Sequence, residues 1–122
     1  MFEYRARVTR VIDGDTLELE IDLGLAVTVN TKIRLYGIDT WEKRHRDPIH
    51  RERGLAAKAF VEGEMERCKS EVLVRTHKDR TGKYGRYLAN VEYMNGASKC
   101  GLADELRKRG FEKDLSYVSA EI

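Results

Sequence analysis

This sequence contains little cysteine and no long apolar run, and each scarcity excludes a class of protein. Its two cysteines among 122 residues, Cys68 and Cys100, are too few and too far apart to indicate a disulfide framework or a zinc site. We therefore expect two reduced thiols. No apolar stretch approaches the roughly 18 residues that a membrane span requires. The N-terminal residues lack the apolar segment and cleavage site of a signal peptide, so we expect a cytoplasmic protein, or a secreted one if a leader was removed.

The length and composition that are present suit one folded domain. A chain of 122 residues predicts a single domain, 1–122, with a single core. A hydrophobic fraction of 41% beside a charged fraction of 36% is typical of a well-solvated globule rather than of a disordered chain. We expect it to be a monomer.

The charges are unevenly distributed although the formal net charge is only +2. Residues 43–53 carry five Lys or Arg against two acids, and residues 75–86 carry five against one. The first 42 residues hold eight acids and five bases. Two readings stay open: the basic segments are solvated loops, or they face a polyanion while the acids hold a cation beside it.

The first third of the chain reads as a three-stranded antiparallel meander. Residues 2–12, 16–23 and 27–36 alternate apolar and polar side chains, which is the period of a β-strand. The tetrapeptide DGDT at 13–16 is a turn signal between the first two strands.

The rest of the chain predicts two helices and two more strands. Residues 53–69 have helical spacing and composition, and 102–109 read as a short helix that Gly110 ends. Residues 71–76 and 87–93 are rich in β-formers. Five strands with the long helix after the third predict a mainly β, α+β fold: an OB-type five-stranded barrel with a short C-terminal helix.

The three histidines invite a metal site, with Cys68 as a fourth ligand. His45, His50 and His77 lie in segments predicted to be loops and have no helical or zinc-finger spacing. We expect them to be solvent-exposed.

The strand end "RLYGIDTWE", residues 34–42, places an arginine among carboxylates. Arg34 and Asp39 would point to opposite faces of a straight strand, but Gly37 offers a bend that brings them together. Asp13 and Asp15 flank the glycine of the DGDT turn. Turn chemistry alone explains that motif, so a functional role for these acids requires the other charged positions as well.

Taken together, the charged positions describe a phosphodiester hydrolysis site. Asp15 and Asp39 could supply two oxygen ligands to a hard divalent cation. Glu42 could orient or deprotonate a water, and Arg34 and Arg86 could hold the phosphate and the charge that develops on it. The arrangement needs a base, a cation and two arginines from separated segments.

Three motifs in this order resemble those of the staphylococcal nuclease (thermonuclease) family. They are DGDT at 13–16, R-L-Y-G-I-D-T-x-E at 34–42 and K-Y-G-R at 83–86, followed by a helix near Gly54 in the matching place. The resemblance runs from about residue 8 to Gly110.

The resemblance implies an OB-fold endonuclease that uses Ca²⁺ and acts on single-stranded DNA and RNA. The family reaction cuts the P–O5′ bond and leaves 3′-phosphate ends. The resemblance also implies a role for each matching residue: calcium ligands Asp15, Asp39 and the carbonyl of Thr40; the base Glu42; the phosphate-contacting Arg34 and Arg86; the nucleotide-pocket residues Lys83 and Tyr84; and Asp13, an acid behind the calcium ligands.

The sequence departs from the family pattern at three places. Trp41 replaces the proline that usually stiffens the turn before Glu42, and we expect it to pack on the barrel rather than to stack on a base. Gly82 replaces an acid. Only twelve residues follow Gly110, where longer members continue into a third helix, so the resemblance implies a compact member.

Two other interpretations stay open. The barrel could be a non-catalytic module that binds nucleic acid or a protein, or the charged residues could form a structural ion-pair cluster at the barrel rim. Scaffold domains of this type typically lose the carboxylates or arginines, and here all of them remain.

Overall fold

The computed structural model describes residues 2–81 and 87–113, with the main chain alone for 78–81. Its strands and helices follow one another along the chain as β1 (Phe2–Asp13), β2 (Thr16–Asp22), β3 (Thr28–Leu35), α1 (Pro48–Arg67), β4 (Glu71–Thr81), β5 (Tyr87–Asn95), β6 (Ser98–Gly101) and α2 (Leu102–Lys108). Within these residues, neither helix is long and apolar enough to cross a membrane.

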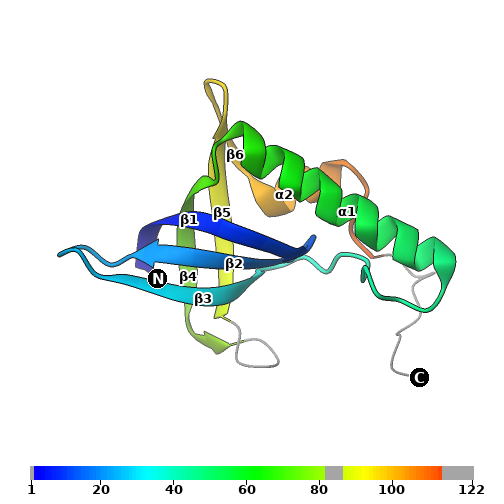
Figure 1. The fold of residues 1–122 in the computed structure, drawn as a ribbon, viewed down its shortest axis with the longest axis horizontal. Helices are drawn as coiled ribbons and strands as arrows, with labels where there is room; N and C mark the ends of the chain where they lie inside the picture. Colours follow the sequence, from blue (N-terminus) through cyan, green and yellow to red (C-terminus); the bar gives the residue numbers. More distant parts are fainter. Residues whose placement is uncertain (1, 82–86, 114–122) are drawn as a thin grey trace.

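The strands form a closed five-stranded barrel with a sixth strand at its edge. The sheet order is β3-β2-β1-β4-β5-β6, and a parallel pairing of β3 with β5 closes the barrel. All other pairings are antiparallel (Figure 1). The prediction of an OB-type barrel with two helices is confirmed. The sixth strand was not predicted; it is a four-residue partner of β5 across a tight turn at Gly96.

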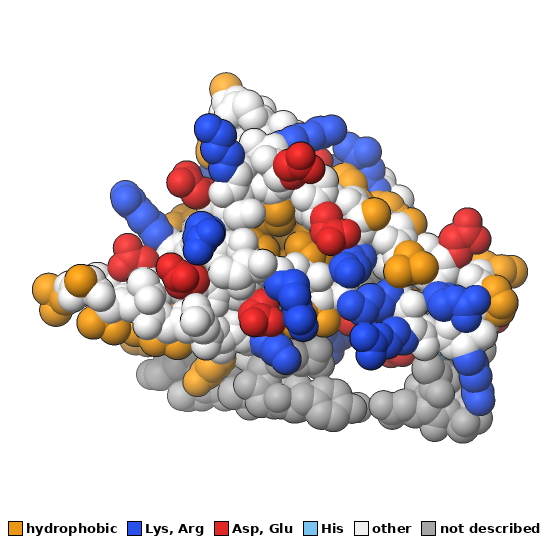
Figure 2. Space-filling model, in the orientation of Figure 1, with side chains coloured by type: hydrophobic (Ala, Val, Ile, Leu, Met, Phe, Trp, Pro, Cys, Tyr) orange, Lys and Arg blue, Asp and Glu red, His pale blue; other side chains and the backbone are white. Residues whose placement is uncertain are grey.

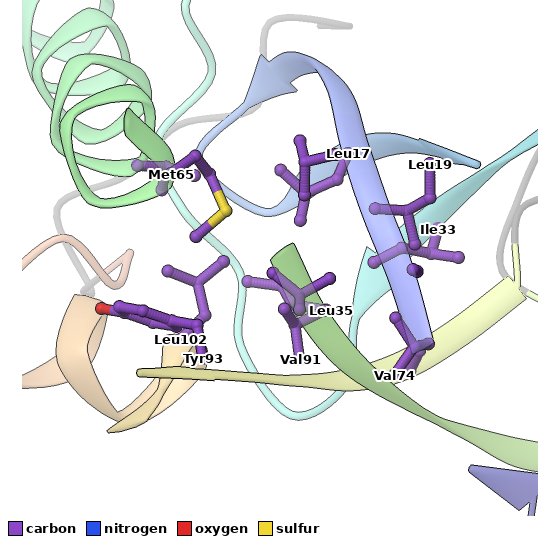
Figure 3. Close-up of a cluster of buried hydrophobic side chains, with 14 of the residues drawn as sticks. Leu17, Leu19, Ile33, Leu35, Met65, Val74, Val91, Tyr93 and Leu102 are labelled. Carbon is purple, nitrogen blue, oxygen red and sulfur yellow. The ribbon is translucent and has the colours of Figure 1, made fainter. Parts of the chain in front are cut away.

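The barrel interior is filled by the apolar face of each strand. Figure 3 shows the labelled core side chains pointing toward one another between the strands and the two helices. The core members with 1% exposure or less include one or two from each of β2, β3, β4 and β5 and from both helices: Leu17, Leu19, Ile33, Leu35, Val61, Val74, Ala89, Leu102 and Leu106. Their alternation along the strands is the pattern that the sequence predicted.

Helix α1 lies across one end of the barrel (Figure 1). Its buried side chains Ala57, Val61 and Met65 are four residues apart, so they form one stripe that packs against the core. The helix begins five residues earlier than predicted. Asp47 caps it by accepting a hydrogen bond from the Ile49 N–H at 2.9 Å, and Pro48 occupies the first helical position, where its missing N–H costs nothing.

Candidate active site

The turn between β1 and β2 places Asp15 at the end of the barrel where the turn meets α1. Asp15 is only 8% exposed; one carboxylate oxygen accepts the Thr16 hydroxyl at 3.0 Å and the other accepts the Thr40 N–H at 3.1 Å. Gly14 permits this close approach. A Cβ there would come within 2.8 Å of the Ala57 Cβ and 2.9 Å of the Thr40 hydroxyl. The turn is therefore wedged between α1 and the chain that leaves β3.

Arg34 reaches both of the acids that the sequence assigned to a cation. It is paired with Thr16 in the β2–β3 ladder, next to Asp15, and its Nη2 lies 3.6 Å from the Asp15 Oδ2. The same nitrogen forms an ion pair with the Asp39 carboxylate. Gly37 makes this possible, since its φ of +80° turns the chain back beyond the strand end. Two acids from separate parts of the sequence, Asp15 and Asp39, thus meet at one guanidinium group.

The chain after α2 completes the rim of this site. Thr40 forms an isolated antiparallel bridge with Glu112, and the Lys113 N–H donates to the Asp39 carbonyl at 2.8 Å. The Lys113 Nζ lies 3.9 Å from the Glu42 Oε1. The residues after Gly110 carry no periodic pattern, so nothing local in the sequence predicts that they pair with the loop after β3.

Glu42 is held by the packing of its neighbours. Trp41, at 1% exposure, is buried, with the Arg53 guanidinium 4.7 Å above its ring and His50 beside it at 4.8 Å. The expectation that Trp41 is buried is confirmed, although the ring neighbours His50 and Arg53 belong to α1 rather than to the barrel. The side chain of Glu42 itself is 48% exposed, so solvent reaches it. A buried anchor therefore precedes an accessible carboxylate.

Asp13 adds a further carboxylate behind Asp15. Burial raises its pKa above the ordinary value, the charge of Asp15 raises it further, and Glu42 acts in the same direction. Lys43 opposes these effects through its charge and its main-chain N–H. These carboxylates share one neighbourhood, in which negative charge is costly unless a cation offsets it.

A pocket of about 340 Å³ opens beside Arg34 and Asp39. Leu88 of β5 and the chain at Glu112 and Lys113 form its other walls. A larger groove, of about 950 Å³, lies elsewhere, between the β5–β6 hairpin and the outer ends of β1 and β2. Its cations are interspersed with Glu20, Asp22, Glu71 and Glu92, and it contains none of the site residues. The smaller pocket, which carries the arginine and the carboxylate, is the better candidate for substrate.

The histidine expectation was wrong for two of the three residues. His45 and His50 are 2% and 7% exposed and meet edge to face at 4.7 Å, in the cluster that encloses Trp41. The large ring of Trp41 needs neighbours, and the early start of α1 supplies His50 as one of them. His77 is half-buried and stacks on Tyr36 at 3.7 Å.

The remaining predicted site residues, Lys83, Tyr84 and Arg86, lie outside the described residues, as does Gly82. Their sequence position places them between β4 and β5. Strand β4 continues through Thr81, into the segment predicted to be a loop.

The residues present fit a weakly held hard cation rather than a closed metal centre. Within residues 2–81 and 87–113, no group of three or more His, Cys, Asp or Glu is placed to hold a metal ion. Asp15 and Asp39 nonetheless both lie beside one positive group, the Arg34 guanidinium. A carboxylate offers about four lone-pair positions, and those left over from the hydrogen bonds above remain for such an ion.

The fold and this geometry define a class: a small OB-type barrel with carboxylates and an arginine gathered at one end. The family model described as "Staphylococcal nuclease homologue" matches residues 32–119. The chain belongs to that family. It is also 31% identical over 132 aligned residues to the uncharacterized protein MJ1439 of Methanocaldococcus jannaschii, across 95% of this chain. It spans 60% of the length of that relative.

Proposed function

We propose that this protein is a calcium-dependent nuclease that hydrolyses single-stranded DNA and RNA. The cut falls on the P–O5′ bond and leaves 3′-phosphate and 5′-hydroxyl ends. Membership of the staphylococcal nuclease homologues supports the nuclease class. The substrate, the ion and the product ends are the proposal.

One observation carries the proposal: Arg34 contacts Asp15 and Asp39 together, at a pocket of about 340 Å³. A structural ion pair needs one acid and no pocket. Two carboxylates on one arginine, with the exposed Glu42 close by, instead match the needs of a site that binds a phosphate and activates a water.

In the proposed reaction Glu42 accepts a proton from the water that attacks phosphorus. As the new P–O bond forms and the P–O5′ bond breaks, negative charge grows on the phosphoryl oxygens. Arg34, and Arg86 from the segment before β5, stabilise that charge by donating bidentate hydrogen bonds. The leaving 5′ oxygen takes up a proton from water as it departs, and Glu42 then returns its proton to the solvent, so that protons balance over the reaction.

Asp15, Asp39 and the Thr40 carbonyl are the residues that would hold the calcium ion. Its chemistry is that of a Lewis acid, which adds positive charge beside the phosphate. The chain holds part of this set in place: the Asp15 carboxylate accepts hydrogen bonds from Thr16 and Thr40, and the main chain at Asp39 is held by a hydrogen bond from the Lys113 N–H.

The decisive experiment measures cleavage of a single-stranded oligonucleotide in Ca²⁺, in Mg²⁺ and in chelator. Glu42→Gln removes the base without changing side-chain size, and we expect turnover to fall by about 10²- to 10⁴-fold. Glu62→Gln, an exposed acid on α1, is the matched control and should cut as the wild type does. Mass spectrometry identifies the phosphorylated end of the products.

Three results contradict parts of this proposal. If Glu42→Gln cuts nearly as fast as the wild type, Glu42 is not the base. If the products carry 5′-phosphates, the bond that is cut is not P–O5′. Absence of cutting in every metal, together with salt-sensitive binding of the oligonucleotide, would identify a binding module instead of an enzyme.

A further inference from the structure

Positive side chains from three segments gather next to the site with fewer acids than cations beside them: Glu18 pairs with Arg10, and the charge of Asp13 acts on Lys43. The cations are Arg10 on β1, Lys43 and Arg44 on the loop after β3, and Lys58 on α1, and together we call them the basic face. Figure 2 shows Lys and Arg side chains gathered over the N-terminal half of α1 and the loop that leads into it. Lys43 directly follows Glu42, so this face borders the site.

The packing of the backbone explains why these cations meet. Gly54 of α1 lies against the main chain at Glu42 and Lys43, and the β1–β2 turn lies against Ala57 through Gly14. Lys58 follows Ala57 directly. The contacts that position the site residues therefore also bring the basic side chains together.

The gathered charge is costly to the protein alone. Desolvation lowers the pKa of Lys43, and the charges of Lys58, Arg44 and Arg10 lower it further, against the opposing effect of Asp13. Glu18 lies 3.5 Å from Arg10 on this face. The first turn of α1 contains no acidic residue, and the acid at this helix N-terminus is the capping residue, Asp47. An external polyanion would relieve this repulsion.

The large groove near the β5–β6 hairpin gives a contrast. There Arg7 pairs with Glu20 at 3.6 Å, and Lys99 pairs with Glu92 at 3.5 Å. On the basic face the ion pair of this kind is Arg10 with Glu18, so the large groove has more of its positive charge offset by acids.

We propose that the basic face binds the phosphates of the same nucleic-acid strand on one side of the bond that is cut. The inference rests on the proposed function, since continuity with Glu42 identifies the occupant as the substrate strand. Lysine and arginine side chains contact phosphates without reading bases, and the neighbouring Trp41 is buried. The face therefore lengthens the bound strand without adding sequence preference, for DNA and RNA alike.

The test compares two triple variants that lose the same net charge. One is Arg10→Ala, Arg44→Ala, Lys58→Ala on the basic face. The matched control is Arg5→Ala, Arg67→Ala, Lys99→Ala, from the rim of the large groove. The probe is a fluorescent twelve-residue thymidylate, and its affinity is measured by anisotropy in chelator across a range of salt, so that the strand stays intact. Thermal unfolding establishes that both triples are folded.

We expect the basic-face triple to bind about 10- to 100-fold more weakly at low salt, and the slope of log affinity against log salt to fall by about two. The control should bind within about twofold of the wild type. The ratio of kcat/KM for the twelve-residue strand over a dinucleotide should fall in the basic-face triple alone, because a dinucleotide does not reach this face.

Equal losses in both triples, or no loss in either, overturn the inference, since net charge alone or another surface then binds the strand. Loss of binding to anionic phospholipid vesicles with unchanged oligonucleotide affinity would assign the face to a membrane and also overturn it. The affinity outcomes, unlike the kcat/KM ratio, are independent of the proposed function. If the wild type does not cut, the affinities of the two triples can still be compared. If the wild type cuts and the basic-face triple binds the strand as tightly as the wild type, the proposed role of the basic face is wrong and the proposed function stands.

Discussion

Gly54 of α1 lies directly against the main chain of Glu42. A Cβ at this position would overlap the Glu42 carbonyl group and come within 2.5 Å of the Lys43 nitrogen. Glycine is required here for space, since any side chain would push the helix away from the loop. A residue outside the three motifs, Gly54, therefore holds the backbone of the proposed base Glu42. The family usually stiffens this turn with a proline at the position of Trp41.

Gly54→Ala should lower kcat by at least about 10-fold and the free energy of unfolding by about 1–3 kcal/mol, because the methyl group displaces the Glu42 main chain or the helix. Gly63→Ala is the matched control. It lies in the same helix with nothing within 4 Å of a Cβ, and we expect the free energy of unfolding to rise by about 0.4–1 kcal/mol. Urea unfolding and oligonucleotide cleavage measure both. Unchanged kcat in Gly54→Ala would show that the contact does not position the base.

Trp41→Ala should destabilise the protein by about 3–5 kcal/mol, because it empties a fully buried site between α1 and the barrel. Leu55→Ala, at a half-exposed position of α1, should cost less than about 1 kcal/mol. The midpoints of urea unfolding distinguish the two variants. Equal midpoints would mean that the Trp41 ring adds nothing to the packing.

Arg107→Ala should lower both stability and turnover, because α2 acts on the site through this side chain. Its Nη2 donates to the Gly37 carbonyl at 2.6 Å, and its Nε lies 3.6 Å from Glu112. Since Arg107 is 42% exposed, we expect a loss of only about 1 kcal/mol in the free energy of unfolding. Lys108→Ala, which removes a contact to Glu105 alone, is the control. Identical kcat in the two variants would exclude a link from α2 to the Gly37 turn.

Tyr93→Phe tests a buried pair by its pH dependence. Tyr93 is 3% exposed and donates to the Glu64 Oε2 at 2.8 Å; burial, and then that bond, raise the pKa of the phenol above 10.0. Above pH 10 the unfolded chain loses this proton while the folded chain keeps it, so the wild type loses stability as the pH rises.

Tyr93→Phe should therefore be less stable than the wild type by about 1–2 kcal/mol at pH 7, since Glu64 loses a donor. The difference should narrow above pH 10. Urea unfolding at pH 7 to 11 measures it, with Tyr4→Phe, a half-buried position, as the control. A difference that stays constant across this range would contradict the raised pKa.

The sequence predicted the strands best because each strand's alternation is local. Residues such as Leu17, Leu19 and Ile33 show their burial in their spacing. The same holds for the bend at Gly37, where the sequence placed Arg34 and Asp39 together and the structure pairs them. The proposed roles of these residues stay predictions until cleavage is measured.

The errors arose where burial depends on a distant partner. His45 and His50 lie in a charged segment that reads as exposed, and only the packing of Trp41 against α1 buries them. Lys113 reaches the site by pairing of the chain beside Asp39, which no local pattern predicts. A glycine inside a helical run, such as Gly54, indicates a close contact, but the sequence does not show that the contact is with the main chain of Glu42.

The sequence by itself determined the barrel, the two helices and the identities of the charged residues, because periodicity and turn chemistry act between near neighbours. Tertiary structure decided how those residues meet. Strand β3 pairs with β5, α1 packs against the main chain of Glu42, and Lys113 bonds to the main chain of Asp39. Each of these contacts joins segments that are distant in sequence. Such contacts depend on close packing in three dimensions, and they bring the site together with the basic face beside it.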